Sequence, residues 1–303
     1  MIAETEPRSS VGASARSLSQ VHKWWASKIA PLLAVTFLAL IIEPLGVGDA
    51  IRRGGAMLWS ACLLATAAYV VNDWYDREVD AINEPLRPIP SGRIPGRWGL
   101  YIAIGWTGVS LLVATALGPW GFGAAVAGLV LAWIYSAPPL RLKRNGWLGC
   151  AACGLSYEGL AWVTGAAVMA GGAMPPVPSL LLAGLYSLGA LGIMALNDFK
   201  AIVGDRQMGI RSLPVMLGPL RAAQVSSAVM ALPQGVVIAL LLHWDAPWHA
   251  LAVGCLLVGQ GVLMRWFIAK PIERALYYSG FGVPLFVAGM MVSAFALRGL
   301  VTA

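Results

Sequence analysis

The sequence predicts an all-α integral membrane protein with nine transmembrane helices, and three observations predict it. Hydrophobic residues make up 58% of the 303 residues and charged residues only 12%, whereas about 25% of a soluble domain is charged. The hydrophobic residues are collected into runs of membrane-spanning length. The basic residues are concentrated in every second connection between those runs. This pattern excludes a soluble globular protein.

The helices are expected in nine apolar runs, each close to the length that crosses the hydrocarbon core. Gly118, with the neighbouring Pro119 and Trp120, marks the boundary between the third and fourth runs. The polar residues 1–22 lack the apolar stretch of a cleaved signal and are predicted to form a cytoplasmic N-terminal arm, followed by one transmembrane domain over 23–303. The nine runs are 26–47, 55–71, 99–117, 119–135, 148–170, 179–197, 222–243, 247–268 and 281–297.

The distribution of Lys and Arg predicts the orientation of the chain in the membrane. Of 21 basic residues, 18 lie in the arm, at the start of the first run and in the even-numbered connections, and the opposite side holds only Arg52, Arg53 and Arg298. The positive-inside rule therefore places the N-terminus in the cytoplasm and, with nine helices, the C-terminus outside. The net charge of +7 is explained by this topology and by the anionic headgroups of the lipid bilayer, so no nucleic-acid partner is expected.

An acidic segment, residues 72–92, follows the second apolar run. Its residues Asp73, Asp76 and Asp80 are spaced i, i+3 and i+7, which places them on one face of a helix. A second acidic segment, residues 197–212, lies 125 positions further on, and Asn72, Asp73 and Asp80 recur there as Asn197, Asp198 and Asp205. On a helix, Asp198 and Asp205 would also share one face.

Carboxylates at this density suit Mg²⁺. Seven of the 14 acidic residues lie in these two segments, and Mg²⁺ usually bridges protein carboxylates to the phosphates of a substrate. The other interpretation is two solvated loops with helix-capping acids, although capping needs neither the repeat nor the shared face. The predicted metal ligands are Asp73, Asp76, Asp80, Asp198 and Asp205.

Cations alternate with these acids on the same side of the membrane. A Pro-containing connection, residues 135–144, carries Arg141 and Lys143, and further cations follow each acidic segment: Arg87 after the first, and Lys200 and Arg206 in the second. A diphosphate needs both groups, because Mg²⁺ and basic side chains neutralise its charge as it leaves. An apolar tail would lie among the helices, so the pattern indicates a prenyl diphosphate. For any single Arg, the alternative is positive-inside bias alone.

The motifs resemble those of the UbiA-type intramembrane prenyltransferases over nearly the whole chain. The resemblance rests on NDWYD…D at 72–80, YSAPPLRLKR at 135–144, NDFK at 197–200 and GDRQMG at 204–209. Within that family, residues 72–92 and 196–215 are most similar to chlorophyll and bacteriochlorophyll synthases, and residues 156–162 and 279–298 to the bacterial branch. Val203 stands where the family often has an acid.

The resemblance implies a UbiA-type helical bundle with a cytoplasmic cap of loops, in a bacterial inner membrane, either cytoplasmic or intracytoplasmic and photosynthetic. It implies Mg²⁺-dependent esterification of the propionate of a (bacterio)chlorophyllide acceptor by a geranylgeranyl or phytyl diphosphate donor, with release of diphosphate. A propionate is already anionic at neutral pH, so no general base is required. The expected catalytic residues are the five aspartates above with Arg141 and Lys143, and the expected substrate-binding residues are Asn72, Arg87, Tyr135, Asn197, Lys200, Arg206 and Glu158.

Glu158 is a lone carboxylate inside the fifth apolar run. An ionisable residue within the membrane is a functional candidate, and Glu158 could accept a hydrogen bond from the acceptor macrocycle or pair with a cation. The alternative is a protonated Glu bonded to a neighbouring helix.

Two other functions remain open from the sequence. A UbiA-type enzyme with another acceptor, such as a quinone precursor or haem, would carry the same donor motifs. An ion-coupled transporter would also have intramembrane charges and an internal repeat, but its acids should lie near the middle of the membrane. Here the acids of both segments lie at the ends of apolar runs.

Overall fold

A computed structural model describes residues 47–301 as an all-helical bundle. The predicted N-terminal arm (1–22) and nearly all of the first apolar run (26–47) lie outside the described residues. The helices are α2 (Val47–Asn83), α3 (Trp98–Ala114), α4 (Gly118–Ser136), α5 (Gly146–Gly154), α6 (Ala161–Met169), α7 (Val177–Ala195), α8 (Ile202–Gln207), α9 (Leu213–Leu217), α10 (Pro219–His243), α11 (Pro247–Ala269) and α12 (Pro271–Val301). An all-helical structure is expected in lipid, because a membrane-spanning chain must satisfy its backbone polar groups internally.

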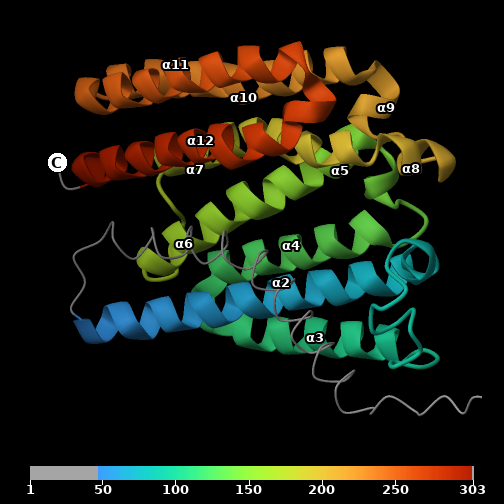
Figure 1. Ribbon diagram of the computed structural model, residues 1–303. Helices are drawn as coiled ribbons and strands as arrows, with labels where there is room; N and C mark the ends of the chain where they lie inside the picture. Colours follow the sequence, from blue (N-terminus) through green and yellow to red (C-terminus); the bar gives the residue numbers. More distant parts are fainter. Residues whose placement is uncertain (1–46, 302–303) are drawn as a thin grey trace, which may run out of the picture.

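The long helices run back and forth along one direction (Figure 1). Residues 84–97, residues 137–145 and the short helices α8 and α9 lie together at the right-hand end of the bundle in that view. We call this end the motif end, because it holds both acidic segments. The predicted cap of loops therefore exists, on one end of the bundle.

Five stretches of the described chain are long and apolar enough to cross a membrane: Trp98–Ser136, Val177–Lys200, Pro219–His243, Pro247–Ala269 and Pro271–Arg298. The first of these contains two antiparallel helices, α3 and α4 (Figure 1). A 3₁₀ turn, Thr115–Leu117, joins them and ends at Gly118 with φ 76°. A Cβ on Gly118 would lie 2.7 Å from the Gly172 Cα, so the turn needs glycine there. The predicted boundary at Gly118 is confirmed.

The fifth apolar run is not a regular helix. It begins with α5, continues through a π-helical segment, Leu155–Leu160, and ends with α6. Asn145 caps its start by accepting hydrogen bonds from Trp147 N (3.0 Å) and Leu148 N (3.2 Å). A π-helical turn changes the direction in which the following side chains point and is frequent at functional sites.

Two groups of helices surround the interior. Helices α7, α10, α11 and α12 share the larger apolar core, where the fully buried rings of Tyr186, Tyr278, Phe199, Phe267 and Phe286 lie. Helices α2, α3, α4 and α6 pack against one another around a smaller core. The α5–α6 helix contacts both groups, and it therefore forms one wall of the space behind the motif end.

Candidate active site

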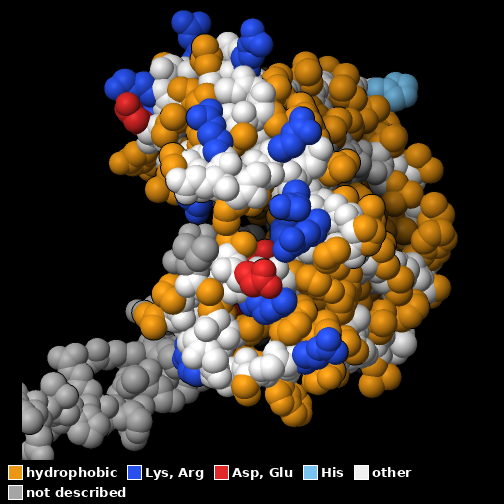
Figure 2. All heavy atoms as spheres, turned by 90° about the vertical axis from the view of Figure 1, so that its right-hand side faces the viewer, with side chains coloured by type: hydrophobic (Ala, Val, Ile, Leu, Met, Phe, Trp, Pro, Cys, Tyr) orange, Lys and Arg blue, Asp and Glu red, His pale blue; other side chains and the backbone are white. Residues whose placement is uncertain are grey.

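The two acidic segments meet at the motif end. Figure 2 shows this face: acidic side chains lie at the edge of a hollow, with Lys and Arg side chains around them. The hollow lies between the α2–α4 group and the α7–α12 group. Charged side chains from two segments 125 positions apart in the sequence therefore lie close together in the folded chain.

The first segment is helical, as its spacing predicts, because α2 continues to Asn83. Its carboxylates are held by Arg87 from the loop that follows. The Arg87 Nη1 lies 2.6 Å from Asp80 Oδ2 and 3.3 Å from Asp73 Oδ1, and its Nε lies 2.7 Å from Glu84 Oε2. One guanidinium thus bridges three acids, of which Asp73 and Asp80 are largely buried and Glu84 is exposed.

The third carboxylate of α2 has a different partner. Lys143 Nζ lies 2.5 Å from Asp76 Oδ1, and the other oxygen of Asp76 accepts a hydrogen bond of 3.0 Å from Asn72 Nδ2. Arg141 donates to the backbone carbonyls of Ser136 (3.2 Å) and Tyr75 (3.0 Å). The predicted connection 135–144 therefore folds directly onto the first acidic segment.

The same connection is joined to the second acidic segment. Arg211 N donates to Arg144 O (3.0 Å), and Gly146 N donates to Arg211 O (2.8 Å). A Cβ on Gly146 would lie 2.4 Å from Leu213 N, so only glycine permits this close approach. These two backbone bonds position both acidic segments around one hollow.

The second segment differs from the prediction. A 3₁₀ turn, Leu196–Lys200, ends at Ala201 before α8 begins, so the premise that Asp198 and Asp205 share one face of a continuous helix is wrong. The regular helix is interrupted at Ala201, a turn residue with φ −101° and ψ 0° that separates the 3₁₀ turn from α8. Asp198 and Asp205 are nevertheless close enough to repel each other. Asp205 is buried, whereas Asn197, Lys200 and Arg206 are exposed.

Burial sets the protonation preferences of these charges. Burial raises the pKa of Asp80, and Arg87 opposes that rise only in part. Burial also raises the pKa of Asp205 and lowers the pKa of Lys143, against the attraction of Asp76. For Arg87, burial alone would lower the pKa, but the pairing with Glu84, Asp80 and Asp73 is stronger and the pKa is raised.

The carboxylate oxygens of the hollow fit a metal ion that binds together with the phosphate groups of a substrate. Within residues 47–301, no group of three or more His, Cys, Asp or Glu side chains is arranged to hold a metal ion. The α2 carboxylates are paired with Arg87 and Lys143 instead. Mg²⁺ usually takes only one or two protein carboxylates and completes its shell with phosphate oxygens and water. The aspartates on the two sides of the hollow supply hard oxygens of that kind.

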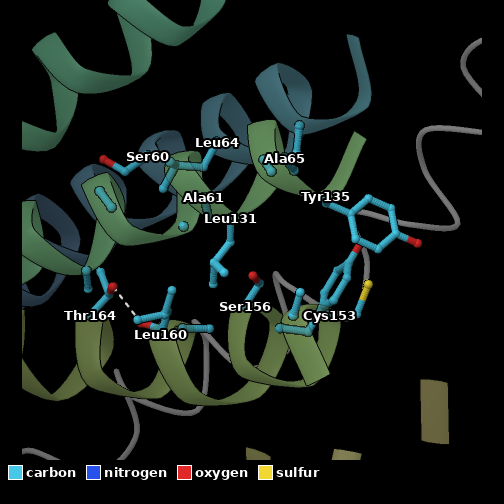
Figure 3. Close-up of a pocket in the computed structure, with 18 of the residues that line it drawn as sticks. Ser60, Ala61, Leu64, Ala65, Leu131, Tyr135, Cys153, Ser156, Leu160 and Thr164 are labelled. Atoms are coloured by element: carbon cyan, nitrogen blue, oxygen red, sulfur yellow. Dashed lines mark hydrogen bonds between the residues drawn. The ribbon is translucent and has the colours of Figure 1, made fainter. Parts of the chain in front are cut away.

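An apolar cavity of about 290 Å³ begins behind these charges. It lies between α2, α4 and the α5–α6 helix, and Figure 3 shows Leu131, Ser156 and Leu160 pointing into it from two sides. Asn72 and Tyr135 line the cavity at the motif end, and Met57 and Gly165 line the opposite end. A polar ligand group in the hollow and an apolar tail in the cavity would therefore be continuous.

Two tyrosines that sequence reasoning missed lie near the junction of hollow and cavity. Tyr69 and Tyr157, both of which line the cavity, have hydroxyl oxygens 3.1 Å apart. Tyr69 lies four residues before Asp73 on α2, so the helical period would have placed the two on one face. No local pattern pairs Tyr157 with α2.

Glu158 lies in the π-helical segment but does not line this cavity. Its Oε2 is buried and makes no hydrogen bond with the described residues. The structure therefore does not bring Glu158 together with the other predicted site residues, and the alternative of a Glu bonded through that oxygen to a neighbouring helix finds no partner in this part of the chain.

The sequence pattern described as the UbiA prenyltransferase family matches residues 32–297. The chain is 55% identical over 244 residues to the bacteriochlorophyll synthase 33 kDa chain of Cereibacter sphaeroides, which covers 80% of each chain. It is 53% identical to the protein of the same description from Rhodobacter capsulatus, with 78% of each chain covered.

Solved structures share the fold at lower identity. A structure of a digeranylgeranylglyceryl phosphate synthase matches with a TM-score of 0.70 at 17% identity, covering 90% of this chain and 98% of the other. A UbiA homolog from Archaeoglobus fulgidus bound to GPP and Mg²⁺ matches with a TM-score of 0.59 at 19% identity, covering 91% of this chain and 96% of the other.

Proposed function

Because this chain belongs to the UbiA prenyltransferase family, we propose that it esterifies the propionate of a bacteriochlorophyllide with a prenyl group taken from a prenyl diphosphate. It is a multi-pass membrane prenyltransferase whose relatives at 53–55% identity are bacteriochlorophyll synthases. The observation that carries the proposal is the continuity between the charged hollow and the apolar cavity. A prenyl diphosphate has the same two parts in the same order.

The donor's diphosphate would lie in the hollow. Mg²⁺, held by oxygens of Asp73, Asp76 and Asp80 on one side and of Asp198 and Asp205 on the other, would supply the positive charge that stabilises the departing diphosphate. The structure of the Archaeoglobus fulgidus homolog contains GPP and Mg²⁺, which supports this assignment.

Arg87 and Lys143 have a second role in the proposal. Both are paired with carboxylates of α2 at the motif end. Both side chains would be able to donate to the oxygens of a bound diphosphate, Arg87 as a fork and Lys143 as a point charge. Arg141, which contacts the backbone of Tyr75, and the exposed Lys200 and Arg206 of the second acidic segment are further phosphate-binding candidates.

The bond changes need no protein base. The C1–O bond of the donor breaks, and its electron pair leaves with the diphosphate. A carboxylate oxygen of the propionate forms the new bond to C1, giving the ester. The acceptor carboxylate is ionised at neutral pH, so no proton has to be removed. Tyr135 and Asn72 line the place where C1 would lie, between the hollow and the cavity.

Product analysis tests the proposal. The purified full chain in lipid nanodiscs would be incubated with Mg²⁺, geranylgeranyl diphosphate and bacteriochlorophyllide, and the pigment product identified by mass. We expect the geranylgeranyl ester, and phytyl diphosphate is run in parallel because either tail fits the argument. Parallel reactions with a phenolic acid and with haem test the other acceptors. A prenylated phenol or haem, with bacteriochlorophyllide unchanged, would overturn the proposed acceptor while leaving the donor site in place.

A further inference from the structure

We propose that Met57 is the residue that limits the length of the prenyl chain, because it closes the far end of the cavity. The inference rests on the proposed function and deepens it by assigning a specificity residue to the donor tail. Met57 lines the cavity at the end opposite to Asn72, and its own exposed fraction is 3%. Its side chain is therefore held between the cavity on one side and packed neighbours on the other.

The packing behind Met57 is a small hydrophobic cluster. It consists of the buried residues Met57, Ala114, Leu117, Ala125 and Val168, with Leu64 and Phe122 packed against it. These residues come from α2, α4, α6, the end of α3 and the turn that joins α3 to α4, so five segments meet at this wall. A close-packed interior resists added volume at a cost of about 1–3 kcal/mol for each overpacked site. A longer tail therefore cannot displace the wall freely.

The length of the cavity matches a twenty-carbon tail. Met57 and Asn72 are fifteen residues apart on α2, which corresponds to about 22 Å at 1.5 Å per residue. A peptide repeat of three bonds extends about 3.3–3.6 Å, so a four-bond isoprene unit extends roughly 4.5–5 Å by the same bond geometry. Four units then need roughly 18–20 Å, and a fifth unit reaches roughly 23–25 Å and would meet Met57.

Small side chains keep the middle of the cavity open. Gly128 on α4 lines it there, together with alanines of α2 and α4. A Cβ added to Gly128 would meet only the Leu160 Cδ1, at 3.8 Å, so a larger side chain can enter the cavity there. Gly128 lies seven residues from Tyr135, about 10 Å along the helix. A plug at Gly128 therefore leaves room for two isoprene units and excludes four.

The first test changes the wall. Wild type and Met57→Ala would be compared with geranyl, farnesyl, geranylgeranyl and geranylfarnesyl diphosphates, which carry ten, fifteen, twenty and twenty-five carbons. We expect the wild type to use the twenty-five-carbon donor poorly, and Met57→Ala to raise its kcat/KM relative to the twenty-carbon donor roughly tenfold, the discrimination typical of a hydrophobic pocket. Equal use of both donors by the wild type, or an unchanged ratio in the variant, would overturn the inference.

The second test fills the cavity and carries its own control. Gly128→Leu should lower kcat/KM for the twenty-carbon donor roughly tenfold or more while retaining the ten-carbon donor. Gly123→Leu is the matched control, because Gly123 lies on the same helix, is exposed, and a Cβ there meets nothing within 4 Å. Equal loss for all donors in Gly128→Leu, or the same change of preference in Gly123→Leu, counts against the length assignment.

A binding measurement separates the two proposals. The shift in thermal unfolding caused by each diphosphate with Mg²⁺ would be measured without any acceptor, in wild type and in Met57→Ala. If the acceptor assignment fails, no ester forms, but the dependence of the shift on tail length should still change in Met57→Ala. A shift that does not depend on tail length in either protein would overturn the inference whatever the acceptor.

Discussion

Replacing Arg87 by Gln should destabilise the protein at neutral pH, because it leaves three acids without their shared cation. The Arg87 side chain is 19% exposed and that of Asp80 is 10% exposed. Breaking a buried ion pair costs about 3–5 kcal/mol, and leaving a hydrogen-bonding group unsatisfied costs about 1–3 kcal/mol. For this partly buried cluster we expect about 2 kcal/mol, which corresponds to a melting temperature lower by about 4–8 °C in a domain of this size.

The stability deficit of Arg87→Gln should depend on pH in a defined direction. Burial already raises the pKa of Asp80, and loss of Arg87 would raise it further. The folded variant then binds a proton more readily than the unfolded chain, so its stability rises as the pH falls through the raised pKa. The deficit of Arg87→Gln relative to wild type should therefore be full above that pKa and should shrink towards the unfolded value near 4.

Thermal unfolding in detergent, without substrate or divalent metal, measures this deficit at about pH 7.5 and about pH 5. Arg77→Gln is the matched control, because Arg77 pairs on the same helix with Glu78, whose side chain is 85% exposed, and such pairs contribute about 0–1 kcal/mol. An unchanged melting temperature in Arg87→Gln at the higher pH, or a deficit that grows on acidification, would refute the reasoning.

Three further predictions concern activity. Asp76→Asn and Lys143→Gln should each lower kcat/KM for the donor by about 10²-fold or more. The double variant should lose less than the product of the two effects, because Lys143 Nζ and Asp76 Oδ1 are 2.5 Å apart. Fully independent losses in this double-mutant cycle would show that the two side chains have separate roles. Removal of divalent metal with EDTA should abolish turnover and added Mg²⁺ should restore it, and full activity in EDTA would exclude the metal. With a propionate acceptor, kcat should stay flat from about pH 6 to 8, and Glu158→Gln should raise the acceptor KM at constant kcat if Glu158 binds the macrocycle; a rising basic limb that disappears in Glu158→Gln would instead make Glu158 a base.

The helices and the first acidic motif were predictable because their causes are local. Apolar runs form helices in lipid whatever their neighbours, since no other structure satisfies the backbone. The spacing of Asp73, Asp76 and Asp80 keeps its meaning because α2 continues through all three. The helix boundary at Gly118 could be predicted because glycine tolerates the positive φ that the chain has at this position.

The rest depends on contacts between distant segments. Arg87 pairs with Asp73, Asp80 and Glu84 only because the loop after α2 folds back over the helix. The second motif is not one continuous helix because the chain turns at Ala201. The spacing of the residues in the sequence does not reveal this turn. The cavity forms between three helices, so the sequence of any one of these helices does not predict it.

A structure of the protein with Mg²⁺ and a non-hydrolysable geranylgeranyl thiodiphosphate tests the central claim most directly. We expect diphosphate oxygens in the hollow, in contact with Lys143 or Arg87 and bridged by metal to Asp73 or Asp76. We also expect the tail between α2, α4 and α6, with its last isoprene unit against Met57. A diphosphate bound elsewhere, or a tail that leaves the 290 Å³ cavity empty, would contradict it.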